Sequence, residues 1–194
     1  MRKFILASNS PRRKELLSNC GFSFEVIPSE CDESIAEKLT PQETVIELAK
    51  RKAMAVLADN RDAVVLGCDT VVAVDGEILG KPSDREQAFE MLMSLSGKRH
   101  IVSSGVCIAD SDSCQCFENT TEVEFYPLTA ETVESYLDTG EYSDKAGAYG
   151  IQGFGSVLVK EIKGDYFSVM GLPVGQCARV LAQFGIDGKT KVNI

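Results

Sequence analysis

The chain has 194 residues, of which 44% are hydrophobic and 25% are charged, and its formal net charge is −9. This composition is typical of a globular protein of one domain, and its negative charge disfavours binding to the phosphates of nucleic-acid polymers. No apolar run approaches the ~20 residues that span a bilayer, and no signal peptide opens the sequence, so we expect a cytoplasmic protein without a membrane partner.

The seven cysteines form no CxxC pair and have no regular spacing. They therefore predict reduced thiols rather than a disulfide framework. Cys114 and Cys116 could form half of a metal site, but the chain has one histidine, His100, and no second cysteine pair nearby. Two thiols on one face of a strand are the preferred interpretation, and a metal site is the disfavoured alternative.

Hydrophobic periodicity, capping residues and turn signals predict the following elements in chain order. The first half is expected to hold a strand at Lys3–Leu6, a helix from Pro11 to about Cys20, a strand at Phe24–Ile27, a helix from Pro41 to about Ala58 and a strand at Val64–Val74. The second half is expected to hold a helix from a capping box at Ser83 to Leu95, strands at Ile101–Ala109 and about Cys116–Tyr126, a helix at about Ala130–Leu137, a strand at Val157–Val159 and a helix at about Pro173–Phe184. Early alternation of strands and helices, followed by hairpins, predicts a mixed α/β sheet.

The turn between the first strand and the first helix has the sequence SNSPRR, residues 8–13. Ser10 is a suitable N-cap, and Pro11 suits the first helical position. Arg12 and Arg13 then lie in the first helical turn, where the helix dipole disfavours a cation by about 0.3–1 kcal/mol. Backbone N–H groups, the hydroxyls of Ser8 and Ser10 and two guanidinium groups would suit a bound phosphate. A surface helix start with snorkelling arginines is the equally weighted alternative.

Asp69 is a carboxylate in the middle of the most apolar predicted strand. An ionised group there must be paired, hydrogen-bonded or bound to a metal, although a neighbouring backbone turn could also satisfy it. At the end of the same predicted strand, Asp75-Gly76 predict a two-residue hairpin turn. This turn places Thr70 opposite Lys81. We therefore expect Lys81 within about one residue of Asp69.

Lys52 falls within the apolar arc of its predicted helix, whereas Lys50 and Arg51 fall outside it. Snorkelling is the common explanation for an inward lysine. Because Asp69 and the two arginines also need partners, a shared cleft that binds a polyanion explains more of these features. The apolar residues that share this arc of the predicted helix with Lys52 are Val45, Leu48, Ala49, Ala53 and Val56.

Two weaker signals remain. Asp32 and Glu33 are adjacent loop carboxylates, which are either solvated or useful for holding a divalent ion. Residues 145–155 are rich in glycine, so that a ligand or another backbone can approach closely, unless this is an ordinary loop.

Six fragments together resemble the Maf family, in order along most of the chain: LASNSPRRKELL, AKRKA, GCDTVV, LGKP, DKAGAYGIQGFG and VMGLPV. The resemblance implies a single domain over residues 1–194. It also implies a two-lobed, twisted mixed β-sheet with flanking helices and a central cleft, as in the inosine triphosphate pyrophosphatases. The activity it implies is hydrolysis of a nucleoside triphosphate to the monophosphate and pyrophosphate with Mg²⁺ or Mn²⁺. Such an enzyme removes non-standard nucleotides from the pool.

The family's site residues match positions of this chain. Asp69 matches the general base, and Glu33 matches the acidic loop residue that would hold the metal with Asp69. The substrate-binding positions match Ser8, Arg12, Arg13, Lys52, Lys81, Thr70 and Gln152. Among these, Arg12, Thr70 and Gln152 look like the branch that acts on dTTP and UTP, with modified pyrimidine nucleotides left open as substrates. The branch that acts on 7-methyl-GTP carries an aromatic residue, a glutamine and a glutamate there.

Two alternatives stay open from the sequence. One is a pyrophosphatase for purine nucleotides such as 7-methyl-GTP. The other is a nucleotide-binding regulator of cell division, in line with the family's older label as an inhibitor of septum formation. The expected partner is the nucleoside triphosphate, and a homodimer is left open.

Overall fold

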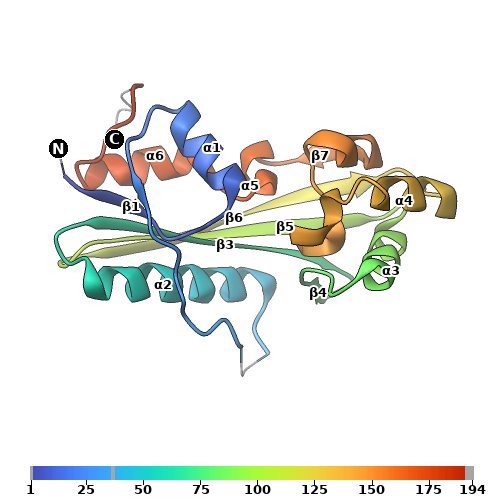
Figure 1. Cartoon of the computed structure of the whole chain (residues 1–194), viewed down its shortest axis with the longest axis horizontal. Helices are drawn as coiled ribbons and strands as arrows, with labels where there is room; N and C mark the ends of the chain where they lie inside the picture. The colour runs from blue at the N-terminus through green and yellow to red at the C-terminus, as the bar shows by residue number, and fades with distance from the viewer. Residues whose placement is uncertain (1, 36–37, 191–194) are drawn as a thin grey trace. The chain divides into compact units, whose positions relative to one another are not determined.

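The computed structural model describes residues 2–35 and 38–190 (Figure 1). It contains a seven-stranded mixed sheet with the strand order β2-β1-β3-β5-β6-β7, in which β4 pairs with β3. The strands are β1 (Phe4–Leu6), β2 (Glu25–Val26), β3 (Val64–Val74), β4 (Glu77–Leu79), β5 (Arg99–Ala109), β6 (Cys114–Phe125) and β7 (Val159–Lys163). The mixed α/β class predicted from the sequence is confirmed.

The helices are α1 (Pro11–Asn19), α2 (Pro41–Asp59), α3 (Arg85–Leu95), α4 (Ala130–Leu137), α5 (Tyr166–Met170) and α6 (Val174–Gln183). Three short 3-10 helices add η1 (Glu141–Asp144), η2 (Ala146–Ala148) and η3 (Gly153–Leu158). Among the described residues, none of these helices is both long and apolar enough to cross a lipid bilayer.

The chain divides into two compact units. Unit 1 consists of Met1–Asp69, Ser104–Asn119 and Gly171–Ile194, and unit 2 of Thr70–Ser103 and Thr120–Met170. The strands β3, β5 and β6 contribute residues to both units. The expectation of a single domain over the whole chain stays a prediction.

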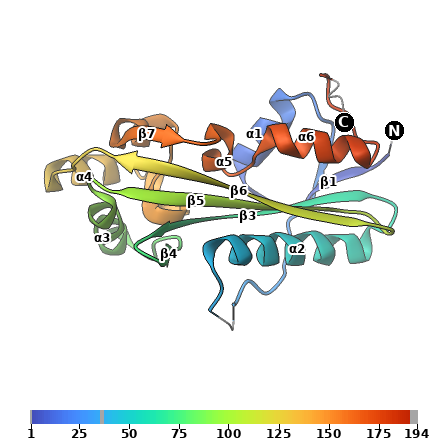
Figure 2. The ribbon, with the colours of Figure 1, turned by 180° about the vertical axis from the view of Figure 1, so that it is seen from behind.

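In unit 1, β1 runs parallel to both β2 and β3. Helix α2 covers one face of these strands, and α1 and α6 cover the other (Figures 1 and 2). Gly67 and Gly105 let α2 approach very closely, because an added Cβ would lie 2.2 Å from the carbonyl oxygen of Ala49 and 2.3 Å from that of Val45, respectively. The inner face of α2 thus lies directly on β3 and β5, as its apolar arc predicts.

In unit 2, α3 and α4 bury apolar side chains against the adjoining parts of β3, β5 and β6, including Val72, Val102 and Phe125. Arg85 joins the two helices through ion pairs with Glu134 at 2.5 Å and Asp138 at 2.7 Å. The strand β7 pairs with β6 in the antiparallel direction. The only histidine of the chain, His100, is buried in this core and bonds through Nε2 to the hydroxyl of Tyr149 at 2.8 Å.

Several element boundaries differ from the sequence predictions. The last predicted strand, Val157–Val159, is instead the end of η3 and the start of β7, which continues to Lys163. The helix predicted to begin with a capping box at Ser83 begins one residue later, because the Asp84 carboxylate accepts from the backbone of Gln87 and the Gln87 side chain accepts from the backbone of Ser83. The sequence also missed α5 and the three 3-10 helices η1, η2 and η3.

The predicted hairpin has the expected register. Asp75 and Gly76 both have positive φ, and Val74 pairs with Glu77 across the two-residue turn. The strand β4 ends at Leu79, however, and the pairing of β3 with β4 ends there with it. The predicted pair of Thr70 and Lys81 therefore lies outside the paired part of the two strands. The neighbourhood of Lys81 and Asp69 therefore stays a prediction.

Candidate active site

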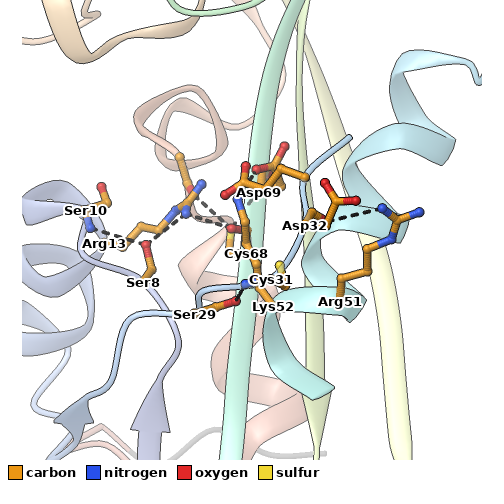
Figure 3. Close-up of polar contacts among 12 residues, drawn as sticks. Ser8, Ser10, Arg13, Ser29, Cys31, Asp32, Arg51, Lys52, Cys68 and Asp69 are labelled. Carbon is orange, nitrogen blue, oxygen red and sulfur yellow. Dashed lines mark hydrogen bonds and ion pairs between the residues drawn. The ribbon is translucent and has the colours of Figure 1, made fainter. Parts of the chain in front are cut away.

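Asp69 has a side-chain partner inside unit 1. It lies in β3, whose other positions are almost all buried, and only 9% of the residue is exposed. The Lys52 ammonium donates a hydrogen bond to Asp69 Oδ1 at 2.6 Å (Figure 3). The carboxylate is thus paired with a lysine, and the alternative in which a backbone turn satisfies it does not describe the structure.

Lys52 also contacts a second carboxylate, because its Nζ lies 2.9 Å from Glu33 Oε2. Its side chain is 12% exposed, so the ammonium ends on two carboxylates rather than in solvent and does not snorkel. Burial alone would lower the pKa of Lys52, but the charges and hydrogen bonds of Asp69 and Glu33 outweigh burial and raise that pKa above its ordinary value. Lys52 is therefore a charged group held between two carboxylates.

The acidic loop that contains Glu33 is fastened to α2 by Arg51. Arg51 Nη1 donates to the carbonyl oxygens of Asp32 at 3.2 Å and Ser34 at 2.8 Å, and its Nε pairs with Glu47 at 2.8 Å. The backbone and hydroxyl of Ser34 donate to the Asp32 carboxylate and lower its pKa. Arg51 thus anchors the acidic loop to α2 (Figure 3), and Lys52 holds the carboxylate of Glu33. The sequence missed this role of Arg51, and the only signal was the i,i+4 spacing of Glu47 and Arg51.

At the start of α1, Arg13 connects three segments of unit 1. Its Nη1 donates to Ser8 Oγ at 3.0 Å and to the carbonyl oxygen of Cys68 at 2.7 Å, and its Nε donates to the carbonyl oxygen of Gly171 at 2.9 Å (Figure 3). Arg13 therefore fixes the position of Ser8 relative to the residue that precedes Asp69. Ser10 occupies the predicted N-cap position, but its side chain makes no capping bond. The backbone N–H groups of this helix start are consequently not capped by the side chain of Ser10.

Cys68 precedes Asp69 and is completely buried. Its thiol donates to the carbonyl oxygen of Gly171 at 3.1 Å. Burial raises the pKa of Cys68, although the nearby guanidinium of Arg13 acts in the opposite direction. A protonated, hydrogen-bonded thiol is a structural group, so Cys68 is not a candidate nucleophile.

The other predicted site residues, Thr70, Lys81 and Gln152, belong to unit 2. Lys81 is exposed and follows Gly80, whose carbonyl oxygen accepts from the backbone of Gly147 at 3.0 Å. Gln152 is half-buried and is the N-cap residue immediately before η3. The segments of Lys81 and Gln152 are thus joined through the glycine-rich loop.

Glu141 holds this glycine-rich loop in place. Its carboxylate accepts from the backbone N–H groups of Phe154 at 3.0 Å and Gly155 at 3.2 Å. Gly153 has φ of +62°, and a Cβ there would lie 2.4 Å from Glu141 Oε2, so the turn requires glycine. Glu141 is a second residue that the sequence did not reveal, since it lies outside the glycine-rich motif.

The donor set of unit 1 suits a hard divalent cation. The carboxylates of Glu33 and Asp69 both contact the Lys52 nitrogen, so the two groups face the same point, where a cationic group is already held. Mg²⁺ is typically bound by one or two carboxylates, with water and phosphate oxygens completing its shell. Glu33 and Asp69 therefore fit the group that the family resemblance implies.

Comparison with known proteins gives the same family across the chain. A model described as "Maf: Maf-like protein" matches residues 3–184. A dTTP/UTP pyrophosphatase of Bacillus velezensis is 51% identical over 185 residues, which cover 95% of this chain and 98% of that protein. A dTTP/UTP pyrophosphatase of Bacillus anthracis is 51% identical over 187 residues, covering 96% and 98%. The structure of the Staphylococcus aureus Ham1 protein aligns with a TM-score of 0.46 and 17% identity, over 81% of this chain and 79% of that one.

Proposed function

Because this chain belongs to the Maf-like protein family, we propose that it is a nucleoside triphosphate pyrophosphatase that hydrolyses dTTP and UTP to the monophosphate and pyrophosphate. The observation that carries this proposal is the Asp69 carboxylate, buried in β3 and held by Lys52 at 2.6 Å. A site that only binds a triphosphate gains nothing from an additional negative charge, whereas a hydrolytic site needs a group that positions water.

The cationic residues are proposed to hold the phosphates. Hydrolysis of a phosphoanhydride depends on positioning and on neutralising charge more than on covalent help. Arg12, Arg13 and the N–H groups at the start of α1 suit phosphate oxygens, with Ser8 already fixed by its bond to Arg13. Lys52 and Lys81 are proposed as the remaining phosphate ligands.

Asp69 is proposed to orient a water molecule and accept its proton as the water attacks the α-phosphorus and pyrophosphate leaves. Lys52 fixes the direction of the carboxylate through its hydrogen bond to Oδ1. When an anionic substrate enters, the Lys52 ammonium can transfer one of its contacts from a carboxylate to a phosphate oxygen, which would free Asp69 Oδ1 for the water.

Mg²⁺ or Mn²⁺ is part of the proposal, with Glu33 and Asp69 as its protein ligands. A divalent ion in this place would supply neutralisation of the phosphate charge. The role of this chain is to keep the two carboxylates together, which it does through Lys52 and through the Arg51 anchor of the acidic loop.

Recognition of the pyrimidine base is assigned to Arg12, Thr70 and Gln152. The Gln152 amide carries a donor and an acceptor, which suit the O4 and N3–H groups of uracil and thymine. The neighbouring turn at Gly153 exposes backbone to a bound base, and Glu141 gives that turn a fixed shape. An ordinary loop is the alternative.

The proposed setting is the cytoplasm, since the cysteines are present as thiols in the described residues and suit a reducing compartment. The proposed partner is the nucleoside triphosphate itself. The net charge of −9 disfavours polymers of nucleic acid.

The experiment is a panel of triphosphates incubated with the full chain and Mg²⁺ or Mn²⁺, with pyrophosphate release as the readout. We expect UTP and dTTP to be hydrolysed well ahead of CTP, dATP, dGTP and 7-methyl-GTP. Preference for 7-methyl-GTP would favour the purine-specific alternative. Tight binding of UTP without any release of pyrophosphate would contradict the enzyme and support a nucleotide-binding regulator.

A further inference from the structure

Three cysteine thiols lie together at one end of the β5–β6 hairpin, in unit 1. Cys107 lies in β5 and is fully buried, whereas Cys114 and Cys116 lie at the exposed start of β6. The sulfur of Cys114 is 3.3 Å from that of Cys107 and 3.7 Å from that of Cys116. All three sulfur atoms lie within 4.8 Å of one another.

The hairpin itself sets this arrangement. Cys114 and Cys116 are two residues apart on one strand and therefore share a face of the sheet. The Asp110 N–H donates to the carbonyl oxygen of Ser113 at 3.0 Å, and the same antiparallel register places Cys107 opposite Cys116. The sequence suggested only the Cys114 and Cys116 pair, because a partner seven residues earlier is brought close by the turn alone.

The turn between the strands is fixed by its own bonds. The Asp110 carboxylate accepts from the backbone N–H groups of Asp112 at 2.9 Å and Ser113 at 2.8 Å. Arg2 pairs with the other oxygen of Asp110 at 2.7 Å. The three thiols are consequently held by a hairpin whose turn is stabilised by hydrogen bonds and an ion pair of Asp110.

We propose that Cys107, Cys114 and Cys116 bind a thiophilic metal ion such as Zn²⁺, as a site separate from the oxygen ligands Glu33 and Asp69. Thiolates at ~2.3 Å from a tetrahedral Zn²⁺ lie about 3.8 Å apart. Cys114 is 3.7 Å from Cys116 and 3.3 Å from Cys107, and the third separation is no more than 4.8 Å, so small side-chain shifts would bring the three sulfur atoms to that geometry. A set of three sulfur donors selects soft ions and is unsuited to Mg²⁺ or Mn²⁺. The exposure of Cys114 and Cys116 leaves room for a water molecule as the fourth ligand.

A nearby charge is consistent with this assignment. Lys50 lies close enough to Cys116 for its positive charge to act on that sulfur. A bound ion would displace the thiol protons, and Lys50 would help to balance the three negative charges around it.

The test uses the reduced, chelator-treated full chain titrated with Cd²⁺ as a spectroscopic substitute for Zn²⁺. We expect one ion per chain, with the ultraviolet charge-transfer absorption of cadmium–thiolate bonds, and competition by Zn²⁺. Cys114→Ser and Cys116→Ser change exposed side chains, so both variants are expected to fold. Replacing a residue that only supports a metal ligand typically weakens metal binding by about tenfold. Each of these variants removes a ligand itself and should therefore weaken Cd²⁺ binding by more than that. Cys20→Ser is the matched control and should bind as the unmodified chain does.

A second readout follows the thiols directly. Zn²⁺ should protect Cys114 and Cys116 from alkylation, as read by mass spectrometry, and should raise the unfolding temperature of the unmodified chain but not of the double variant. Absence of cadmium–thiolate absorption would overturn the proposal. So would binding that survives in the double variant, or a disulfide between these cysteines that persists after reduction and leaves no thiolate for the metal.

Discussion

Lys52 and Asp69 form an ion pair in which each side chain is only 12% exposed and Nζ lies 2.6 Å from Oδ1. The two residues belong to different elements, α2 and β3, whose close approach depends on Gly67. The pair explains why a carboxylate is tolerated in an apolar strand and why a lysine faces the core side of its helix. It also places a cation next to the proposed catalytic group before any substrate arrives.

The first prediction concerns this pair. We expect Lys52→Met to weaken UTP binding and to lower the free energy of unfolding by about 3 kcal/mol, because the Asp69 carboxylate is left buried without its partner. Denaturant unfolding without nucleotide is the measurement.

The double variant Lys52→Met/Asp69→Asn serves as the internal check, because it also removes the carboxylate charge. It should regain most of the lost stability, whereas Lys50→Met, on the exposed side of α2, should lose little. Equal losses in the single and double variants would show that the two residues are not coupled.

The sequence could predict most of the elements because their periodicity and caps are local. It could also predict that Asp69 and Lys52 need polar partners, since each contradicts the apolar pattern around it. It could not predict Arg51 as the anchor of the acidic loop, because its backbone partners at Asp32 and Ser34 lie 17 to 19 residues away. The same limit hid η3, whose turn depends on the distant carboxylate of Glu141.

The second prediction tests that anchor. Arg51→Met should release the loop that carries Glu33 and raise the Mg²⁺ concentration needed for half-maximal activity by about tenfold, a typical effect of residues that position metal ligands. Arg51→Lys should recover part of the loss, and Lys50→Met should change nothing. An unchanged metal requirement in Arg51→Met would mean that the loop needs no anchor.

The third prediction concerns the base. Gln152→Ala should reduce the ratio of kcat/KM for UTP over CTP, because a site built on hydrogen bonds rejects bases that leave its polar groups unpaired. Turnover of UTP at saturation should fall much less than the ratio. A ratio that stays the same would remove Gln152 from base recognition.

The fourth prediction concerns pH and unit 2. Burial lowers the pKa of His100 to about 4, so the folded protein holds this imidazole neutral while the unfolded chain protonates near pH 6.5. The contribution of the neutral His100 to the free energy of unfolding is complete above about pH 6.5. It is lost as the pH falls toward 4, which lowers the free energy of unfolding by up to about 3 kcal/mol. Nδ1 of His100 has no hydrogen-bond partner among the described residues, so no bond offsets the cost of protonation.

Replacing His100 with glutamine removes the only histidine of the chain. Whatever its effect at pH 7, His100→Gln should show a smaller fall in the free energy of unfolding between pH 7 and pH 4 than the unmodified chain. Equal slopes in the two proteins would exclude His100 as the titrating group.

The most direct test of the proposed function is the rate of pyrophosphate release from UTP by Asp69→Asn, with Mg²⁺ present. Asparagine keeps the size of the side chain and, with Lys52 still held by Glu33, should leave the unfolding temperature close to that of the unmodified chain. Loss of the group that positions the attacking water should lower kcat by about 100-fold or more, whereas Asp62→Asn, an exposed control, should retain full activity. A folded Asp69→Asn protein with near-normal turnover would contradict the assignment of Asp69 as the catalytic carboxylate.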